Sequence, residues 1–73
     1  MQFTVIFEHG PTSVGAYVPD LPGCVAVGAT REEAHALITE AMIAHLAGMH
    51  EDGLPVPVPA STSAVITVPD AAA

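Results

Sequence analysis

Apolar and polar residues alternate along the first positions of the chain. Phe3, Val5 and Phe7 fall on one face of an extended segment, and the residues between them fall on the other. This two-residue period predicts a strand over residues 2–8. A short cluster of turn-forming residues follows, and residues 14–18 alternate again. Because the connecting loop is short, we expect the second strand to run antiparallel to the first.

A proline-glycine pair interrupts the pattern after the second strand. In a type II turn, proline presets φ at the second position and glycine accepts the positive φ at the third. The run Leu21-Pro22-Gly23-Cys24 therefore predicts such a turn. Asp20 precedes it and is placed to accept hydrogen bonds from local backbone amides. Residues 24–27 are then predicted to form a third strand, which makes a meander.

The hydrophobic period changes to that of a helix after residue 30. Thr30 followed three residues later by Glu33 is a capping box, which predicts a helix start. Apolar residues then recur at helical spacing, and Gly53 is typical of a helix end. The pattern predicts one long helix over residues 31–52.

The segment after the helix alternates proline with apolar residues and cannot be helical, so we expect residues 54–59 to be extended. Residues 64–68 are rich in β-branched side chains and are predicted to form a fourth strand. The chain is then one α+β domain, 1–73. Its elements form two layers in the order β-β-β-α-β, an antiparallel sheet with one long helix on one face. The strands offer apolar side chains to the second face as well, which predicts a homodimer or a larger even-numbered oligomer such as a tetramer.

Charge narrows the possible partners. The chain has 73 residues, eight carboxylates and one lysine or arginine, Arg31. Binding nucleic acid through its phosphates needs clustered Lys and Arg, so the composition excludes direct nucleic-acid binding by this chain alone. An acidic surface suits a basic protein. Alternatively, the acids only keep a small apolar protein in solution.

The short chain can bury only a small hydrophobic core. A chain this short hides only about 60% of the surface that its unfolded form exposes. The single cysteine, Cys24, excludes an intrachain disulfide, and neither a C-x-x-C nor an H-E-x-x-H motif suggests a metal site. No apolar stretch approaches the ~18 residues of a membrane span, and no signal peptide is visible. We expect a cytoplasmic protein that binds no cofactor, metal or membrane.

The turn and helix-start residues in the middle of the chain resemble those of a known family. The order Tyr17-Val18-Pro19-Asp20-Leu21-Pro22-Gly23-Cys24, then Gly28, then Thr30-Arg31-Glu32-Glu33-Ala34 is similar to the HicB-like antitoxins of toxin–antitoxin systems. The resemblance implies a partial ribonuclease H-like fold and a binding role. The implied partner is a small basic ribonuclease toxin, HicA-like, whose active site the antitoxin covers. Many members carry a C-terminal DNA-binding module, whereas we expect this chain to be a stand-alone domain without one.

Several residues are candidates for contact with a partner, and each has a structural alternative. Tyr17 anchors an interface or is a half-buried strand residue. Asp20 faces a partner or caps the turn. Glu51 and Asp52 lie at the helix end that disfavours anions, so with Glu40 they either meet a basic partner or are solvated. Residues assigned to structure rather than contact are Pro19, Pro22, Gly23, Cys24, Gly28, Thr30, Glu33 and Gly53.

Three functions compete. The first is an antitoxin-like binding protein. The second is an orphan oligomeric domain of this fold, with a structural or small-molecule-binding role and no toxin. The third is a nuclease, which needs several carboxylates converging on a divalent metal. Because the only strand carboxylates are Glu8 and Asp20, at strand ends, we predict that the chain is not an enzyme.

Overall fold

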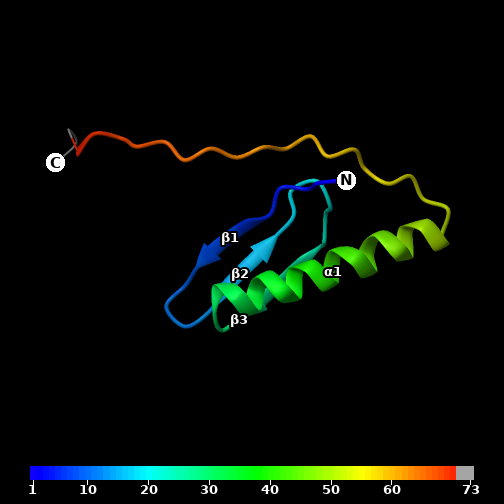
Figure 1. The fold of residues 1–73 in the computed structure, drawn as a ribbon, viewed down its shortest axis with the longest axis horizontal. Coiled ribbons are helices and arrows are strands. Elements are labelled where there is room, and N and C mark those ends of the chain that lie inside the picture. The colour runs from blue at the N-terminus through cyan, green and yellow to red at the C-terminus, as the bar shows by residue number, and fades with distance from the viewer. Residues whose placement is uncertain (71–73) are drawn as a thin grey trace.

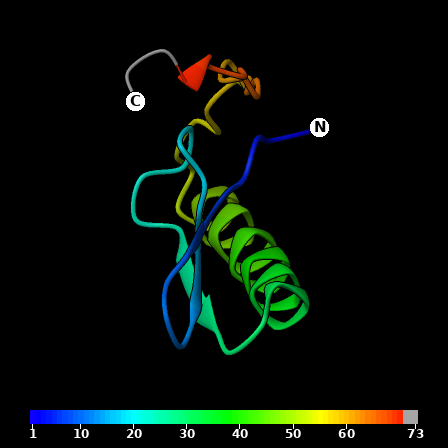
Figure 2. The same cartoon turned by 90° about the vertical axis from the view of Figure 1, so that its left-hand side faces the viewer.

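The computed structural model describes residues 1–70 and contains three strands and one helix in that part of the chain. The strands β1 (Ile6–His9), β2 (Val14–Tyr17) and β3 (Val25–Gly28) precede α1 (Arg31–Glu51). The strands form an antiparallel sheet in the order β1-β2-β3. The helix lies along one side of this sheet (Figures 1 and 2). The α+β class and the β-β-β-α order predicted from the sequence are confirmed.

The strand register separates two faces of the sheet. Phe7 pairs with Ala16, and Ala16 pairs with Ala26, so these three side chains project toward α1. The helix packs chiefly against β3 and β2. The β1 side of the sheet is therefore the less completely covered flank.

The core between sheet and helix is small. Only Leu21 and Ile38 are large side chains with less than 2% of their surface exposed. The residues that pack around this core but stay half-buried include Phe3, Val5 and Phe7, which come from β1 and the extended chain before it. The buried apolar residues in the described part of the chain are Val14, Ala16, Val18, Leu21, Cys24, Ala34 and Ile38.

The turn between β2 and β3 has the predicted geometry. The backbone N–H of Cys24 donates to the Leu21 carbonyl over 3.0 Å, and Gly23 has φ of 84°. Both features belong to a type II turn with glycine at its third position, so that prediction is confirmed. The turn buries Leu21 completely beneath the sheet end.

The helix begins as its capping residues predict. Thr30 is the N-cap, and its hydroxyl accepts a hydrogen bond from the Glu33 backbone N–H over 3.1 Å. The Glu33 carboxylate reaches back to the backbone N–H of Ala29, one residue before the N-cap, over 3.0 Å. Gly28 just before this start lies against the first helical turn. A Cβ at Gly28 would be 2.6 Å from the Ala34 backbone nitrogen.

The helix ends in a Schellman arrangement. Asp52 is the C-cap, Gly53 has φ of 67°, and its N–H donates to the His50 carbonyl over 3.2 Å. The N–H of Leu54 donates to the Met49 carbonyl over 2.9 Å. Gly53 is the left-handed residue that this motif requires, as the sequence predicted. No helix of the described residues is long and apolar enough to cross a membrane.

The fourth strand predicted over residues 64–68 is not formed. This segment is extended, but it makes no hydrogen bond to any other part of the described chain. It leaves the sheet after Ser61 and continues past the N-terminal end of β1 (Figure 1). High β-propensity alone did not produce a strand, because a strand is defined by its hydrogen-bonded pairing and this segment makes none.

Candidate functional site

The sheet face opposite the helix is largely uncovered and apolar. Tyr17 and Val25 pair across β2 and β3 on this face, and Ile6 pairs with Tyr17 from β1. Tyr17 is 38% exposed, and Val25 and Val27 are each 64% exposed. We call the surface formed by Ile6, Tyr17, Val25 and Val27 the open face. An exposed cluster of this kind is typical of an interaction surface.

The structure explains why the open face exists. Alternation in β2 sends Val14 and Ala16 into the core, so Tyr17 must point the other way. Both Val25 and Val27 are β-branched and suit a strand, although their side chains remain in solvent. The only helix of the described residues covers the opposite face (Figure 2). The open face is therefore left exposed by the described part of the chain.

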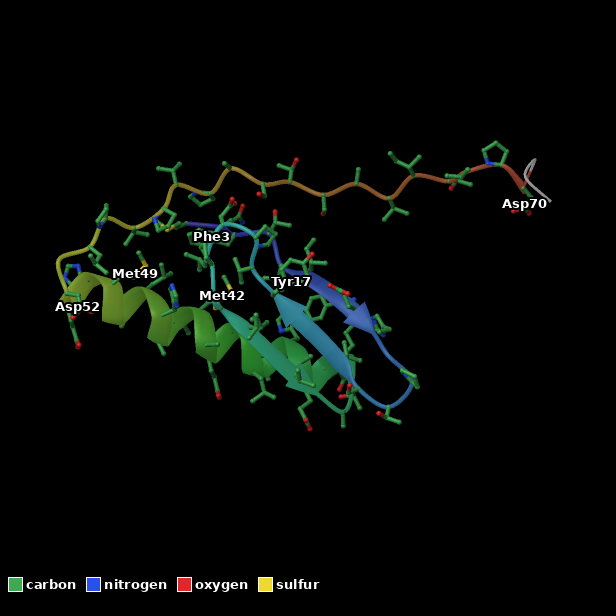
Figure 3. All side chains as sticks on the ribbon, turned by 180° about the vertical axis from the view of Figure 1, so that it is seen from behind. Phe3, Tyr17, Met42, Met49, Asp52 and Asp70 are labelled. Atoms are coloured by element: carbon green, nitrogen blue, oxygen red, sulfur yellow. The ribbon has the colours of Figure 1, made fainter. Side chains whose placement is uncertain are left out.

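The carboxylates predicted to meet a partner do not gather with Tyr17. Glu40 is an exposed residue of α1, and Glu51 and Asp52 lie exposed at its C-terminal end. Figure 3 shows Asp52 at the end of the helix and Tyr17 on the sheet, well apart from each other. Tyr17 and Asp52, each a candidate for partner contact, therefore lie on different parts of the molecule.

Asp20 holds the C-terminal segment to the turn after β2. Its carboxylate accepts hydrogen bonds from the Ser61 backbone N–H over 2.8 Å, the Ala60 backbone N–H over 3.0 Å and the Ser61 hydroxyl over 2.9 Å. These bonds, the Ser61 N–H first and the Ala60 N–H next, lower the pKa of the Asp20 carboxyl below its usual range. The expected capping of local turn amides is replaced by these distant bonds. We call the contact of Asp20 with Ala60 and Ser61 the tail clamp.

A second contact strengthens the clamp from the N-terminal side. The Thr4 hydroxyl donates to the Ser61 carbonyl over 2.6 Å, so Ser61 is held by two segments at once. Residues 2–4 and 59–62 line an open, polar depression between the two extended chains. Nothing in the sequence spacing points to a link between residues so far apart in the chain, and sequence reasoning missed it.

The guanidinium of Arg31, the one arginine of the chain, packs against an aromatic ring of the same molecule. The Cζ atom of Arg31 lies 4.2 Å from the centre of the Phe7 ring, at cation–π distance. The His35 ring stacks parallel to the same Phe7 ring, with 6.1 Å between centroids. The contact attaches the first helical turn to β1. It places the one fixed cation over a core-facing side chain, away from the open face.

The remaining candidates for chemistry are the thiol of Cys24 and possible metal-ligating side chains. Cys24 is buried, and its burial raises the pKa of the thiol, which agrees with the small apolar role expected of it. Within residues 1–70, no three His, Cys, Asp or Glu side chains gather closely enough to hold a metal ion.

Comparison with known proteins agrees with the resemblance of the turn and helix-start residues. Residues 3–73 match the family model described as HicB_like antitoxin of bacterial toxin-antitoxin system. A curated relative is Antitoxin HicB 2 of Photorhabdus laumondii subsp. laumondii, which is 34% identical over 70 residues. That alignment covers 94% of this chain and 50% of the relative, so the chain spans about half the length of the curated relative it matches. The chain belongs to the HicB-like antitoxins of bacterial toxin–antitoxin systems.

Proposed function

We propose that this chain binds a small, basic, HicA-like ribonuclease toxin and neutralises it by covering the active site of the toxin. Membership of the antitoxin family carries this proposal. The chain would supply binding and no chemistry, without a cofactor, and in the cytoplasm, where the RNA substrates of a toxin lie. Its net charge of −7 at pH 7 complements a basic partner.

The open face is the surface proposed to contact the toxin. It combines an exposed tyrosine with two exposed valines, and aromatic anchors are enriched at protein interfaces. Glu8, which pairs with Gly15 next to this surface, is exposed and adds a negative charge to its rim. Burial of the apolar centre would supply affinity, and the acidic rim would favour a partner of opposite sign.

The carboxylates of α1 have a different proposed role. Glu40, Glu51 and Asp52 belong to α1 or its C-cap, and α1 lies on the sheet face opposite the open face (Figure 2), so we place them outside the proposed toxin contact. Their charge would still attract a cationic protein during approach, which raises the association rate more than the affinity. Added salt is expected to slow association, because the Debye length falls to about 10 Å at 0.1 M.

Self-association is the other part of the proposal. The sequence assigned the second face of the sheet to a second copy of the chain, and Tyr17 lies on that face. A toxin and a second copy cannot occupy the same apolar surface together. We propose that the toxin takes the open face, so a homo-oligomer that also binds toxin must use another contact.

The test uses two lysine substitutions of equal charge. Val25→Lys places a lysine on the open face, and Ile43→Lys places one on the outer side of α1. The two native side chains are 64% and 66% exposed, so neither change disturbs the core. The adjacent reading frames are first searched for one that encodes a small lysine- and arginine-rich protein. Its product is the probe, co-expressed with each variant and assayed for RNA cleavage.

The expected result is a difference between the two variants. Val25→Lys should weaken binding by at least about tenfold and restore RNA cleavage, because a lysine would be buried without a partner. Ile43→Lys should inhibit as the unaltered chain does, apart from a slightly slower association. Equal inhibition by both variants would refute the assignment of the open face as the toxin-binding surface. If the unaltered chain neither binds nor inhibits the neighbouring protein, the proposal that the partner is a ribonuclease toxin is refuted.

A further inference from the structure

Gly15 is a glycine that the fold does not require. It lies within β2, the central strand of the sheet, where glycine is less favourable than alanine because it loses more conformational freedom on folding. Gly23 and Gly53 have positive φ, and a Cβ at Gly28 would collide with the backbone of α1. Gly15 has neither feature: its φ is not positive, and a Cβ there would meet only the Glu8 carbonyl oxygen, at 4.0 Å. The described part of the chain therefore gives no structural reason for a glycine at this position.

The missing side chain leaves a space on the open side of the sheet. Glu8, Gly15 and Val27 form one row across the three strands, and alternation puts this row on the same face as Tyr17. Neighbouring strands are about 4.8 Å apart, so the backbones at Glu8 and Val27 are about 10 Å apart, with no side chain between them. This width accepts one aliphatic chain at van der Waals distance and not two. We call the space above Gly15, between the side chains of Glu8 and Val27, the notch.

The three side chains around the notch differ in chemistry. Val27 is 64% exposed and supplies an apolar wall, and Glu8 supplies an exposed carboxylate on the opposite side. Tyr17 is the next residue of β2 on this face and is 38% exposed. Tyr17 and Glu8 are diagonal neighbours on adjacent strands, a separation of about 7–8 Å that long side chains can bridge. A ligand in the notch would meet a hydrocarbon surface, an aromatic ring and an anion.

The Glu8 carboxylate finds no lysine or arginine within this molecule. The chain has one such residue, Arg31, and its guanidinium lies 4.2 Å from the centre of the Phe7 ring. Phe7 projects toward α1, on the other side of the sheet from Glu8. The charge beside the notch is therefore available to a cation from another molecule.

We propose that the notch receives one arginine side chain of the protein that binds the open face. The aliphatic stem of this arginine lies over Gly15 and against Val27, and its guanidinium pairs with the Glu8 carboxylate and stacks on the Tyr17 ring. Arginine fits better than lysine, because its planar guanidinium can hydrogen-bond a carboxylate through two N–H groups and stack on an aromatic face. Glycine is then needed because a ligand approaches the backbone closely. The inference rests on the proposed function, since it names the side chain that the open face takes from its basic partner.

The first test separates the stability of the fold from binding. Gly15→Ala adds a methyl group inside the notch, and Gly48→Ala makes the same change on α1, where a Cβ would meet no atom within 4 Å apart from its own helix backbone. Both variants should raise the melting temperature by about 2–8 °C. The probe is the small lysine- and arginine-rich protein from the adjacent reading frame. Only Gly15→Ala should weaken its binding, and Gly15→Val, which fills more of the notch, should do so at least about tenfold.

A stabilised variant with impaired binding is a result that a purely structural Gly15 would not give. If Gly15→Val binds the neighbouring protein as tightly as the unaltered chain does, the notch is refuted. The toxin proposal survives that outcome when Val25→Lys still abolishes binding.

The second test identifies the partner residue. The arginines of the neighbouring protein are changed to lysine one at a time and measured against the unaltered chain, Glu8→Gln and Glu32→Gln. Glu32 is an exposed carboxylate in the first turn of α1, so it controls for the loss of one charge. One arginine should lose much less affinity in the Glu8→Gln background than in the other two, which is the signature of a direct pair. If no arginine is coupled to Glu8, the proposed pairing is wrong.

The third test needs no toxin. The probes are acetyl-Gly-Arg-Gly-amide and the same peptide with citrulline, which replaces the guanidinium by a neutral group of the same shape. The arginine peptide should cause saturable shifts in the amide NMR signals of Gly15 and Val27. The citrulline peptide should not, and neither should the arginine peptide with Gly15→Val. Equal shifts with both peptides, no shifts with either, or shifts that persist in Gly15→Val would each refute the notch, whether or not the neighbouring protein binds.

Discussion

Replacing Gly28 with alanine tests whether the strand and helix meet as closely as the structure indicates. The new Cβ would lie 2.6 Å from the Ala34 nitrogen, 3.0 Å from the Glu33 carbonyl carbon and 3.1 Å from the Ala34 Cα. All three atoms are helix backbone, so no side chain can rotate away to make room. The first turn of α1, which the Thr30 cap and Ala34 burial hold in place, would have to shift.

The expected loss follows from these contacts. Overpacking a close site costs about 1–3 kcal/mol, and the upper part of that range applies when backbone must move. Alanine also restricts the unfolded chain, which offsets about 0.4–1 kcal/mol. We expect Gly28→Ala to lower the free energy of unfolding by ~1–2 kcal/mol, or the melting temperature by roughly 4–8 °C for each kcal/mol.

Gly48→Ala is the matched control for that experiment. Gly48 lies inside α1 and a Cβ there would meet no atom within 4 Å apart from its own helix backbone. Alanine in a helix interior should therefore stabilise the chain by about 0.5–1 kcal/mol. Thermal unfolding followed by circular dichroism, at one fixed protein concentration, measures both variants. Equal stability of Gly28→Ala and the unaltered chain would refute the close approach of β3 and α1.

Two further perturbations address the clamp and the helix cap. The Ser61 and Ala60 hydrogen bonds depress the Asp20 pKa below its ordinary value of 3.8, so the clamp is complete above that value and is lost as pH falls through the lower folded-state pKa. The amide NMR signals of Ala60 and Ser61 should shift together as the pH falls. In Asp20→Ala the same two signals should already have their low-pH chemical shifts at neutral pH. Amide signals that respond neither to acid nor to Asp20→Ala would contradict the clamp. Thr30→Ala should reduce the free energy of unfolding by about 1 kcal/mol through loss of the N-cap, whereas Thr62→Ala, at an exposed position without hydrogen bonds, should change it little; urea denaturation compares the two.

The elements that the sequence predicted well are those with local causes. The type II turn at Pro22 and Gly23 and the capped start of α1 depend on neighbouring residues, and both formed as predicted. The predicted helix, 31–52, exceeds the observed one only by Asp52, which is its C-cap. The first strand was predicted to begin at residue 2 but begins at Ile6, because alternation continues through extended chain that has no partner.

The predictions that failed depended on distant contacts. The β-branched pattern of residues 64–68 describes a segment suited to a sheet, yet it cannot specify which edge accepts it. Asp20 was expected to face a partner or to cap its own turn, but its carboxylate accepts hydrogen bonds from the Ala60 and Ser61 amides. A carboxylate before a turn has the same sequence signature in both situations. Only the return of the chain after α1 distinguishes them.

The small core connects the stability of this chain to its association. Within residues 1–70, seven apolar residues are buried, and only two of these, Leu21 and Ile38, are large and fully enclosed. A core of this size leaves little margin over conformational entropy. At the same time, the open face and residues 65–68 leave several large apolar side chains exposed. Any partner that binds the folded chain adds RT ln(1 + [L]/Kd) to its stability, or about 2.7 kcal/mol when the partner is at 100 times its Kd. The same surfaces that would recognise a partner are therefore the surfaces through which the partner would stabilise this fold.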